Sequence, residues 1–444
     1  MSSHGICPEC KNSYKYGRCK PCNSKHFQND FNNWTSGNDK IDKFIQDAQL
    51  NAIDYLEVIE WIPYDRFKNV KQIGKGGFGT IHYARWIDGF IRKWDIENQQ
   101  WKRWYENLEV ALKKFDNFVN FDDVLNEMEI HLKTWSVYSP SIRFYGITQD
   151  PETHSYMMVL QYAKDGNLRQ YLKNNFNNIN WKQKLHNLWQ LSLGLMKIHE
   201  LDIVHQDFHP GNILLPDFES DLRISDFGLS KLIGTNPNNP EKKNIFGVLP
   251  YIAPEVLSGE REYTKAADVY SCGIIAYEMV TGFPPYPDIP HDNDLALKIC
   301  NGLRPKIPFH TPKLITRIIM RCWDARVTYR PTFKELEDKL WKYYDDYVDY
   351  LREGKNKNSE IVIQIKKAEE FSANQESTNK TTTTTTTPLN YQTHPQAIYT
   401  SRLLNYSKLP KPKNEENFER ELEELTKSTS ALSIVASKLH VPDF

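Results

Sequence analysis

Five short motifs follow one another in the middle of this 444-residue chain, and together they contain the residue types that phosphoryl transfer from ATP requires. Glycines let a backbone approach phosphate oxygens, and a lysine can pair with phosphate. Carboxylate and carboxamide oxygens can accept a proton or hold Mg²⁺. In chain order, the motifs are Gly74-Lys75-Gly76-Gly77-Phe78-Gly79, Val110-Ala111-Leu112-Lys113, His205-Gln206-Asp207 with Asn212, Asp226-Phe227-Gly228 and Ala253-Pro254-Glu255.

Each motif is weak alone, but five in this order and at these spacings are specific. Over residues 67–346 the chain therefore resembles the eukaryotic protein kinases. His209, two residues after Asp207, resembles the tyrosine-kinase-like branch, whereas Tyr251-Ile252 before Ala253 resembles the Ser/Thr kinases. The resemblance implies an α+β bilobal fold, with a small lobe of antiparallel sheet plus one helix and a large helical lobe.

The resemblance also implies how the small lobe holds ATP. Lys113 would pair with the α- and β-phosphates, with Glu127 as its carboxylate partner and Glu129 as the alternative. Strand alternation directs the neighbouring Lys114 away from the site. Further nucleotide contacts are expected from the glycine-rich loop, the adenine pocket and the hinge, at Gly74, Gly76, Gly77, Phe78, Gly79, Ile81, Ala111, Leu160, Gln161 and Ala163.

In the large lobe, the resemblance assigns the chemistry to the segment around Asp207. Asp207 would accept the proton of a protein hydroxyl, and Asn212 and Asp226 would hold Mg²⁺, or Mn²⁺ in its place. His209 would stabilise γ-phosphate charge when it is protonated. The expected activity is a serine/threonine protein kinase of intracellular signalling, with proteins as substrates.

Four residues depart from the family pattern. Gln206 replaces the usual Arg before the base, His209 replaces a Lys, Val248 replaces a Thr, and His131 occupies a position that is usually apolar. Gln206 has no charge to pair with a phosphorylated activation loop, so activity is not expected to need that phosphorylation. The alternative to an active enzyme is a pseudokinase scaffold that binds ATP and partner proteins. The retained lysine, base and metal ligands favour the enzyme.

The N-terminal residues contain a second chemical pattern. Cys7-x-x-Cys10 is followed by Cys19-x-x-Cys22, and two such pairs can place four thiolates tetrahedrally around one Zn²⁺. A stretch this small buries too little apolar area to fold alone, so metal binding and folding should be coupled. A redox pair, or four unconnected thiols, is the alternative.

Composition limits the partners and the setting. The formal net charge is −1, which does not favour a strongly basic surface for nucleic acid. The sequence contains no run of about 18 apolar residues, so we expect no membrane span. The clustered cysteines indicate reduced thiols and one metal site, so we expect a cytoplasmic protein, with the nucleus as the alternative.

These patterns divide the chain into four regions: a zinc-ribbon-like module at 1–30, a helical linker at 31–66, the kinase domain at 67–346 and a largely disordered tail at 347–444. Apolar spacing predicts that the linker helix continues to Trp61 and ends at Pro63. The tail contains a polar threonine run, Thr381 to Thr387. Docking of other proteins is expected through the zinc module and the acidic stretch from Glu416 to Lys427.

Overall fold

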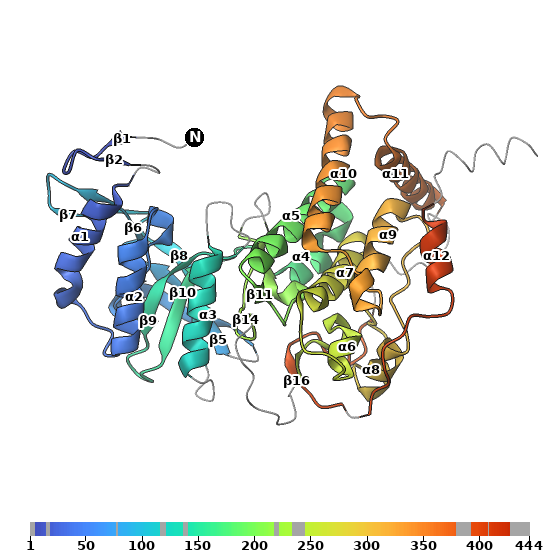
Figure 1. Ribbon diagram of the computed structural model, residues 1–444, viewed down its shortest axis with the longest axis horizontal. Coiled ribbons are helices and arrows are strands. Elements are labelled where there is room, and N and C mark those ends of the chain that lie inside the picture. Colours follow the sequence, from blue (N-terminus) through green and yellow to red (C-terminus); the bar gives the residue numbers. More distant parts are fainter. Residues whose placement is uncertain are drawn as a thin grey trace, which may run out of the picture. The chain divides into compact units, whose positions relative to one another are not determined.

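The computed structural model describes residues 5–14, 18–76, 79–115, 121–135, 141–216, 222–232, 245–378, 392–406 and 408–426. It divides the chain into two compact units, which are described separately. Unit 1 consists of Met1–Gly166 and Leu214–Ser230, and unit 2 of Asn167–Ile213 and Lys231–Phe444. Figure 1 labels their helices and strands.

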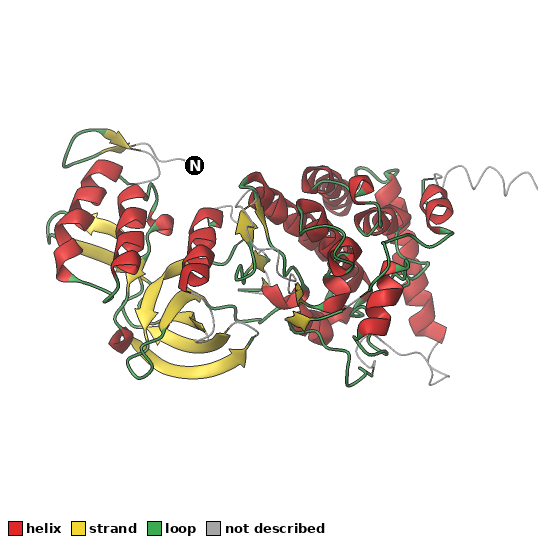
Figure 2. Ribbon diagram, turned by 60° about the horizontal axis from the view of Figure 1, so that its bottom comes forward, coloured by secondary structure: helices red, strands yellow, loops and turns green. Residues whose placement is uncertain are grey.

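Unit 1 is built on a six-stranded sheet in the order β3-β9-β10-β8-β5-β4. All neighbouring strands are antiparallel except β3 and β9, which are parallel. Figure 2 shows these strands as yellow arrows. Their bounds are β3 (Glu60–Trp61), β4 (Phe67–Lys75), β5 (Gly79–Trp86), β8 (Leu108–Phe115), β9 (Phe144–Gln149) and β10 (Tyr156–Gln161).

The two faces of the sheet are covered by different apolar clusters. Val110 and Leu112 of β8 belong to one cluster, and Phe115 belongs to the other, which also contains residues of α2 (Asp39–Asn51) and α3 (Phe121–Thr134). Successive strand residues point to opposite faces. This alternation therefore places Lys113 on the face of Ala111, as predicted.

The linker is an integral part of unit 1. Ile41 and Ile45 of α2 are fully buried and share a core with Val124 and Met128 of α3. The helix ends at Asn51, earlier than predicted, because the chain turns extended and Glu60–Trp61 pairs with β9 as strand β3. Of the apolar residues behind the prediction, Ile59 is buried just before this strand, Leu56 lies in a short 3-10 turn and Ile53 is exposed.

The residues between β5 and β8 form a separate hairpin of β6 (Phe90–Asp95) and β7 (Gln100–Trp104). Trp94 stacks on His26 with ring centroids 4.0 Å apart, and Trp101 stacks on Phe27 at 4.2 Å. Both partners lie on α1 (Lys20–Asp30), which packs beside α2 in Figure 1. The tryptophans of this hairpin therefore bind the N-terminal module to the rest of unit 1.

Unit 2 is mainly helical. Helix α7 is buried along almost its whole length, and α5 packs against α10. The helices are α4 (Leu168–Asn175), α5 (Trp181–Glu200), α6 (Pro254–Leu257), α7 (Lys265–Thr281), α8 (Asn293–Cys300), α9 (Lys313–Cys322), α10 (Phe333–Glu353), α11 (Glu360–Thr378) and α12 (Phe418–Glu424). Short strands are β11 (Ile203–Val204), β14 (Lys231–Leu232), β15 (Ile245–Gly247) and β16 (Arg402–Leu404), while β12 (Ile213–Leu214) and β13 (Arg223–Ile224) form a small pair elsewhere.

The tail after residue 346 is more ordered than its composition predicts in the parts that the structure describes. Helix α10 continues to Glu353, where Gly354 ends it with φ +65°, and Ile361, Val362 and Ile365 of α11 are buried. Phe418 in the acidic stretch is also buried, and Glu419 pairs with Arg326 at 3.1 Å. Packing on unit 2 compensates for the entropy of ordering. The threonine run lies outside the described residues.

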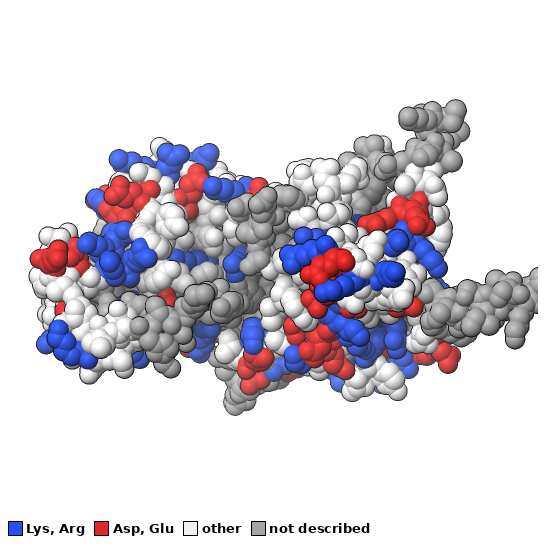
Figure 3. All heavy atoms as spheres, turned by 90° about the horizontal axis from the view of Figure 1, so that it is seen from above, with Lys and Arg blue, Asp and Glu red and all other residues white. Residues whose placement is uncertain are grey.

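The surface carries charges of both signs. On the face drawn in Figure 3, basic and acidic side chains of the described residues are interspersed. Within the described part of the chain, no helix combines the length and apolarity that crossing a membrane requires.

Candidate active site and metal centre

Lys113 on β8 stands between two carboxylates of unit 1. Its Nζ donates to Glu127 Oε1 at 2.5 Å and to Asp226 Oδ1 at 2.8 Å. Burial alone would lower the pKa of Lys113, but Asp226 and Glu127 raise it above its usual value. The lysine is therefore a fixed cation, held from the strand, from α3 and from the segment that follows β13.

The two alternatives for the carboxylate partner are resolved by the helix. Glu127 is buried on α3, whereas Glu129 points outward and pairs with Lys133 at 2.6 Å. Lys114 lies on the opposite face of β8 and donates to Asp150 at 2.7 Å. Strand and helix periodicity thus separate each functional candidate from its neighbour.

Asp226 and Phe227 occupy a constrained turn. Asp226 has a φ of +62°, which is uncommon for a residue other than glycine. The ring of Phe227 meets His131 edge to face, with centroids 4.8 Å apart. His131 is fully buried, neither ring nitrogen has a hydrogen-bond partner among the described residues, and Glu127 Oε1 is 3.8 Å away. The departure noted at His131 therefore places an unsatisfied polar ring beside Phe227.

The glycine-rich loop joins β4 and β5. A Cβ on Gly74 would lie 4.0 Å from Ile81 Cβ, and one on Gly76 would lie 3.8 Å from the Gly79 carbonyl oxygen, both ordinary contacts, whereas a Cβ on Gly79 would lie 2.2 Å from the Lys114 carbonyl oxygen. Strand packing therefore requires glycine at position 79, while Gly74 and Gly76 keep the backbone bare for an approach to phosphate. Gly77 and Phe78 lie outside the described residues.

The expected adenine contacts share one region of the sheet. Ile81 pairs with Lys113 across β5 and β8, and Ala111 pairs with Leu160 across β8 and β10. The amide of Gln161 donates to the Arg143 carbonyl at 2.9 Å, so that N–H is already engaged within the protein. The carbonyl of Ala163 accepts from Gly166 at 3.2 Å.

Residues His205 to Asn212, which form the catalytic loop of the expected kinase, lie together in unit 2. Asn212 Nδ2 donates to the backbone carbonyl of Asp207 at 2.9 Å and lies 3.3 Å from Asp207 Oδ2. Gln206 has a φ of +67°. Its amide and that of His205 donate to the buried carboxylate of Asp268, at 3.2 Å and 2.9 Å. Asp268 therefore stabilises the strained backbone that presents Asp207.

His209 is held in one tautomer by its surroundings. Its Nδ1 accepts from the Gly211 amide at 3.0 Å, so the proton of the neutral ring lies on Nε2. Nε2 is 3.6 Å from Asp207 Oδ1 and 3.0 Å from the hydroxyl of Ser401. Sequence reasoning missed Ser401. The apolar residues near it, Ile398, Tyr399 and Leu404, could have indicated an ordered segment within the tail that was expected to be largely disordered.

A buried ion pair supports the last of the five motifs, Ala253-Pro254-Glu255. Arg330 donates to both carboxylate oxygens of Glu255, at 2.7 Å and 2.8 Å. Its Nη1 also donates to the Ala266 carbonyl. Such bidentate geometry fixes Ala253-Pro254-Glu255 against the start of α7.

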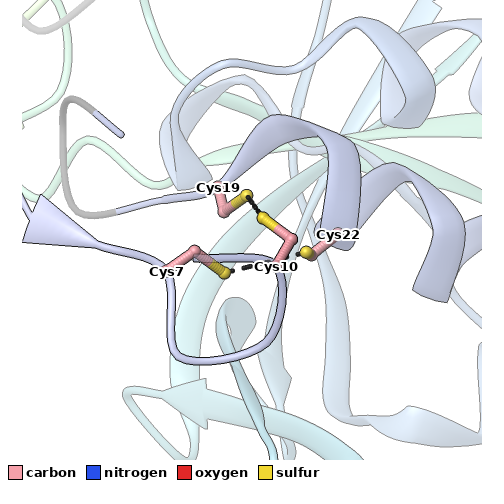
Figure 4. A group of neighbouring side chains, drawn as sticks. All are labelled: Cys7, Cys10, Cys19 and Cys22. Carbon is pink, nitrogen blue, oxygen red and sulfur yellow. Dashed lines mark hydrogen bonds between the residues drawn. The ribbon is translucent and has the colours of Figure 1, made fainter. Parts of the chain in front are cut away.

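The four N-terminal cysteines form a compact cluster, drawn in Figure 4. Cys7 and Cys10 lie in the loop between β1 (Gly5–Ile6) and β2 (Ser13–Tyr14), while Cys19 precedes α1 and Cys22 lies in its first turn. All four sulfur atoms lie within 4.8 Å of one another, with Cys7–Cys22 at 3.7 Å and Cys10–Cys19 at 3.5 Å. Sulfurs bound 2.3 Å from one tetrahedral ion would be about 3.8 Å apart. The donor set therefore fits Zn²⁺.

A buried arginine adjoins the third of these cysteines in the chain. Arg18 precedes Cys19, and none of its three guanidinium nitrogens has a hydrogen-bond partner among the described residues. Burial lowers the pKa of Arg18 to about 10, so it remains charged at neutral pH. Cation–π contacts with Phe27 and Trp101 show that this arginine belongs to the packing of α1 on the tryptophan hairpin.

Comparison with known proteins places these residues in a family. The model of the protein tyrosine and serine/threonine kinase family matches residues 67–340. The chain is 28% identical to Tyrosine-protein kinase SPK-1 of Girardia tigrina over 279 residues, which are 61% of this chain and 52% of that protein. It is 31% identical to Serine/threonine-protein kinase VIK of Arabidopsis thaliana over 290 residues, which are 62% of this chain and 60% of that protein.

The chain thus spans just over half the length of these two relatives. A third relative, the Probable serine/threonine-protein kinase pats1 of Dictyostelium discoideum, is 28% identical over 300 residues, only 8% of that protein. Residues 1–66 and 341–444 lie outside the family match. The match covers more than half of the chain and contains all five motifs, so the chain belongs to the protein tyrosine and serine/threonine kinase family.

Proposed function

We propose that this protein is an active protein kinase that transfers the γ-phosphoryl group of Mg-ATP to serine or threonine hydroxyls of proteins. The observation that carries the proposal is the buried contact of Lys113 with both Glu127 and Asp226. In this family the lysine–glutamate pair and the metal-binding aspartate must both be in place for catalysis. A decayed enzyme has no need to keep a buried lysine between two carboxylates, because buried charges are costly unless they are paired.

Each residue would have one task in the reaction. Lys113 would hold the α- and β-phosphates, and Asn212 and Asp226 would hold Mg²⁺, which neutralises charge on the phosphates when it is bound. The amide nitrogen of Asn212 donates to the backbone carbonyl of Asp207, and its side-chain carbonyl oxygen is the atom that would bind the metal. Asp207 would accept the proton of the attacking hydroxyl.

The choice of serine and threonine over tyrosine rests on sequence features. The curated relatives include kinases named for either specificity. Tyr251-Ile252 before Ala253 follows the Ser/Thr pattern. Tyr251 is also buried, and its hydroxyl donates to Glu278 and accepts from Arg169, so this residue belongs to the scaffold beside the catalytic loop.

A pseudokinase scaffold is the second candidate. The unsatisfied ring of His131 beside Phe227 and the uncharged Gln206 before the base favour it. Both residues would weaken an enzyme without abolishing nucleotide binding.

Turnover of radiolabelled ATP on a generic protein substrate distinguishes the two candidates. Replacing the base, Asp207→Asn, should lower the rate by about 10²–10⁴. Acid hydrolysis of the substrate phosphorylated by the wild-type protein should release phosphoserine and phosphothreonine. Equal, background-level rates for wild type and variant would favour the scaffold, and phosphotyrosine alone would overturn the proposed specificity.

We further propose that Cys7, Cys10, Cys19 and Cys22 bind one structural Zn²⁺. Four thiolates complete the coordination shell and leave no position for catalysis. The cluster lies where the hairpin loop meets α1, and α1 packs on the Trp94 and Trp101 hairpin. The metal would therefore stabilise the N-terminal part of unit 1.

A further inference from the structure

A segment from outside the family match runs through unit 2 beside residues 245–247. β16 (Arg402–Leu404) pairs antiparallel with β15 (Ile245–Gly247), which lies shortly before Ala253-Pro254-Glu255. Figure 1 draws β16 in red, although the elements around it come from much earlier in the chain. An extended peptide that adds a strand to another strand is a common mode of peptide recognition. The geometry therefore resembles a bound peptide that is covalently part of the same chain.

The residues before β16 are anchored by many polar contacts. His291 donates its amide to the Gln396 carbonyl at 2.9 Å, and its Nδ1 lies 2.9 Å from the Ile398 carbonyl. Arg169, itself paired with the buried Glu278, donates to the Tyr399 carbonyl at 3.0 Å. These contacts fix the backbone on the N-terminal side of Ser401.

Apolar and polar side chains complete the attachment. Ala397 and Leu404 are buried, on either side of Ser401. The Tyr399 hydroxyl donates to the Pro285 carbonyl at 2.8 Å, and Arg402 donates to the His291 carbonyl at 2.5 Å. Ser401 is thus held between two anchored stretches, so its position is set from both sides.

The hydroxyl of Ser401 is oriented for reaction. Its Oγ donates to Asp207 Oδ2 at 2.5 Å. Because the proton of neutral His209 lies on Nε2, that nitrogen donates to the same Oγ at 3.0 Å. The serine proton therefore points at the base, which is the arrangement that general-base catalysis requires. The neighbouring hydroxyls differ, since Thr400 is exposed and the Tyr399 hydroxyl is engaged with Pro285.

We propose that Ser401 is an intramolecular phosphorylation site, modified by the catalytic loop of its own chain. This inference rests on the proposed kinase activity and extends it to a specific acceptor. In the step, Ser401 Oγ forms a bond to the γ-phosphorus of ATP, and the bond from that phosphorus to the bridging oxygen breaks. ADP leaves with the electron pair, and the hydroxyl proton passes to Asp207.

The modification would end the contact that positions the serine. Phosphoserine no longer carries the proton that Ser401 donates to Asp207, and it adds a charge of about −1.5 to −2 beside that carboxylate. Repulsion should release the segment. β15 and the catalytic loop would then be uncovered for other protein substrates.

The test incubates dephosphorylated full-length protein with Mg-ATP and maps phosphate by mass spectrometry. Wild type should gain phosphate on Ser401, at a first-order rate that does not depend on protein concentration. Ser401→Ala should lack this phosphate, and the matched control Thr400→Ala, one residue away and exposed, should retain it. Ser401→Thr should also be modified, which distinguishes loss of the acceptor from loss of the fold.

A generic protein substrate in the same reaction separates this inference from the proposed function. Phosphate on that substrate but none on Ser401 would overturn the inference but not the proposed kinase activity. The segment around Ser401 would then only cover Asp207. A rate at Ser401 that rises with protein concentration, or transfer from wild type to an Asp207→Asn chain, would overturn the intramolecular route. Phosphate on neither acceptor would overturn both the function and the site.

Discussion

Each unit carries a segment from outside the family match, and the two segments are used differently. The N-terminal segment contributes apolar side chains, since Ile41 and Ile45 pack against Val124 and Met128 on the helix that carries Glu127. The C-terminal segment contributes a hydroxyl that donates directly to Asp207. The first therefore supports the helix that carries the partner of Lys113 mainly through packing, whereas the second contacts the carboxylate that we propose as the base.

This difference shows how additions to a kinase domain can act. A segment that buries apolar area changes the stability and rigidity of an element without entering the chemistry. A segment that presents a polar group to the base competes with substrates or becomes one. The same comparison predicts that changes in the N-terminal module of residues 1–30, called the head below, should mainly affect stability. Changes around Lys113 should affect activity and stability together.

Removal of the metal from the head should have the largest effect on stability. Structural Zn²⁺ contributes about 10–16 kcal/mol of apparent binding free energy in small zinc-finger peptides, and a fraction of that should appear here because α1 packs on the tryptophan hairpin. A strong chelator should therefore lower the unfolding temperature and change the fluorescence of Trp94 and Trp101. Metal content should be one Zn²⁺ per chain.

The matched variant is Cys7→Ser. It should lose the metal and show no further change with chelator. Wild-type protein that contains no zinc, or that unfolds identically with and without chelator, would contradict the role of the head. Loss of kinase activity without any loss of stability would contradict the comparison itself.

Breaking the charge cluster of Lys113, Glu127 and Asp226 should have the next largest effect, a loss of at least about 3 kcal/mol in the free energy of unfolding. Glu127→Gln removes one partner of a buried pair, which typically costs about 3–5 kcal/mol of the free energy of unfolding. Lys113 would keep only Asp226, and kcat should fall. Glu129→Gln, two residues away on the exposed side of α3, should change stability by less than about 0.5 kcal/mol.

Chemical denaturation and steady-state kinetics measure both effects. Equal results for the two glutamates would show that the Lys113 pair does not contribute. In that case the apolar support from α2 would be the main determinant of the position of α3.

The smallest effect should be a gain in stability from His131→Leu. The change removes a buried imidazole whose nitrogens lack hydrogen-bond partners among the described residues, and an unsatisfied polar side chain of this kind costs about 1–3 kcal/mol. Kinase activity should be equal or higher, because a leucine would pack against Phe227 as well as the imidazole does. A lower free energy of unfolding would show that His131 has a stabilising role.

His199→Leu is the control, since His199 is also buried but its Nε2 lies 2.9 Å from Asp268. Loss of that hydrogen bond should lower stability. Opposite signs for the two histidines would confirm that satisfaction of the ring, rather than burial itself, determines the cost.

The sequence predicted the local arrangements well where a single periodicity determines them. Alternation along β8 separated Lys113 from Lys114, whereas the choice of Glu127 over Glu129 came from the resemblance to the kinases and is confirmed by the contact with Lys113. The end of α2 was misplaced because Ile53, Leu56 and Ile59 satisfy a helical spacing while the chain pairs with β9. Strand pairing with a distant partner is not visible in local spacing.

The part of the site that could not be predicted depends on contacts between distant residues. Ser401 lies 194 positions from Asp207, in a region whose polar composition indicated disorder. Its order depends on anchors such as Arg169 and His291, which carry no motif. The folded surface of unit 2, rather than any intrinsic propensity of the segment, determines where this serine lies.

Strand β3 also affects how the protein can be shortened. A chain cut at the limits of the family match would lose Glu60–Trp61 and end inside α10, which runs to Glu353. The edge of β9 would then present unpaired amides and carbonyls, a surface that promotes aggregation. Recombinant expression of the protein should therefore start near residue 5 and extend past α11, because the limits of sequence similarity are not the limits of independent folding.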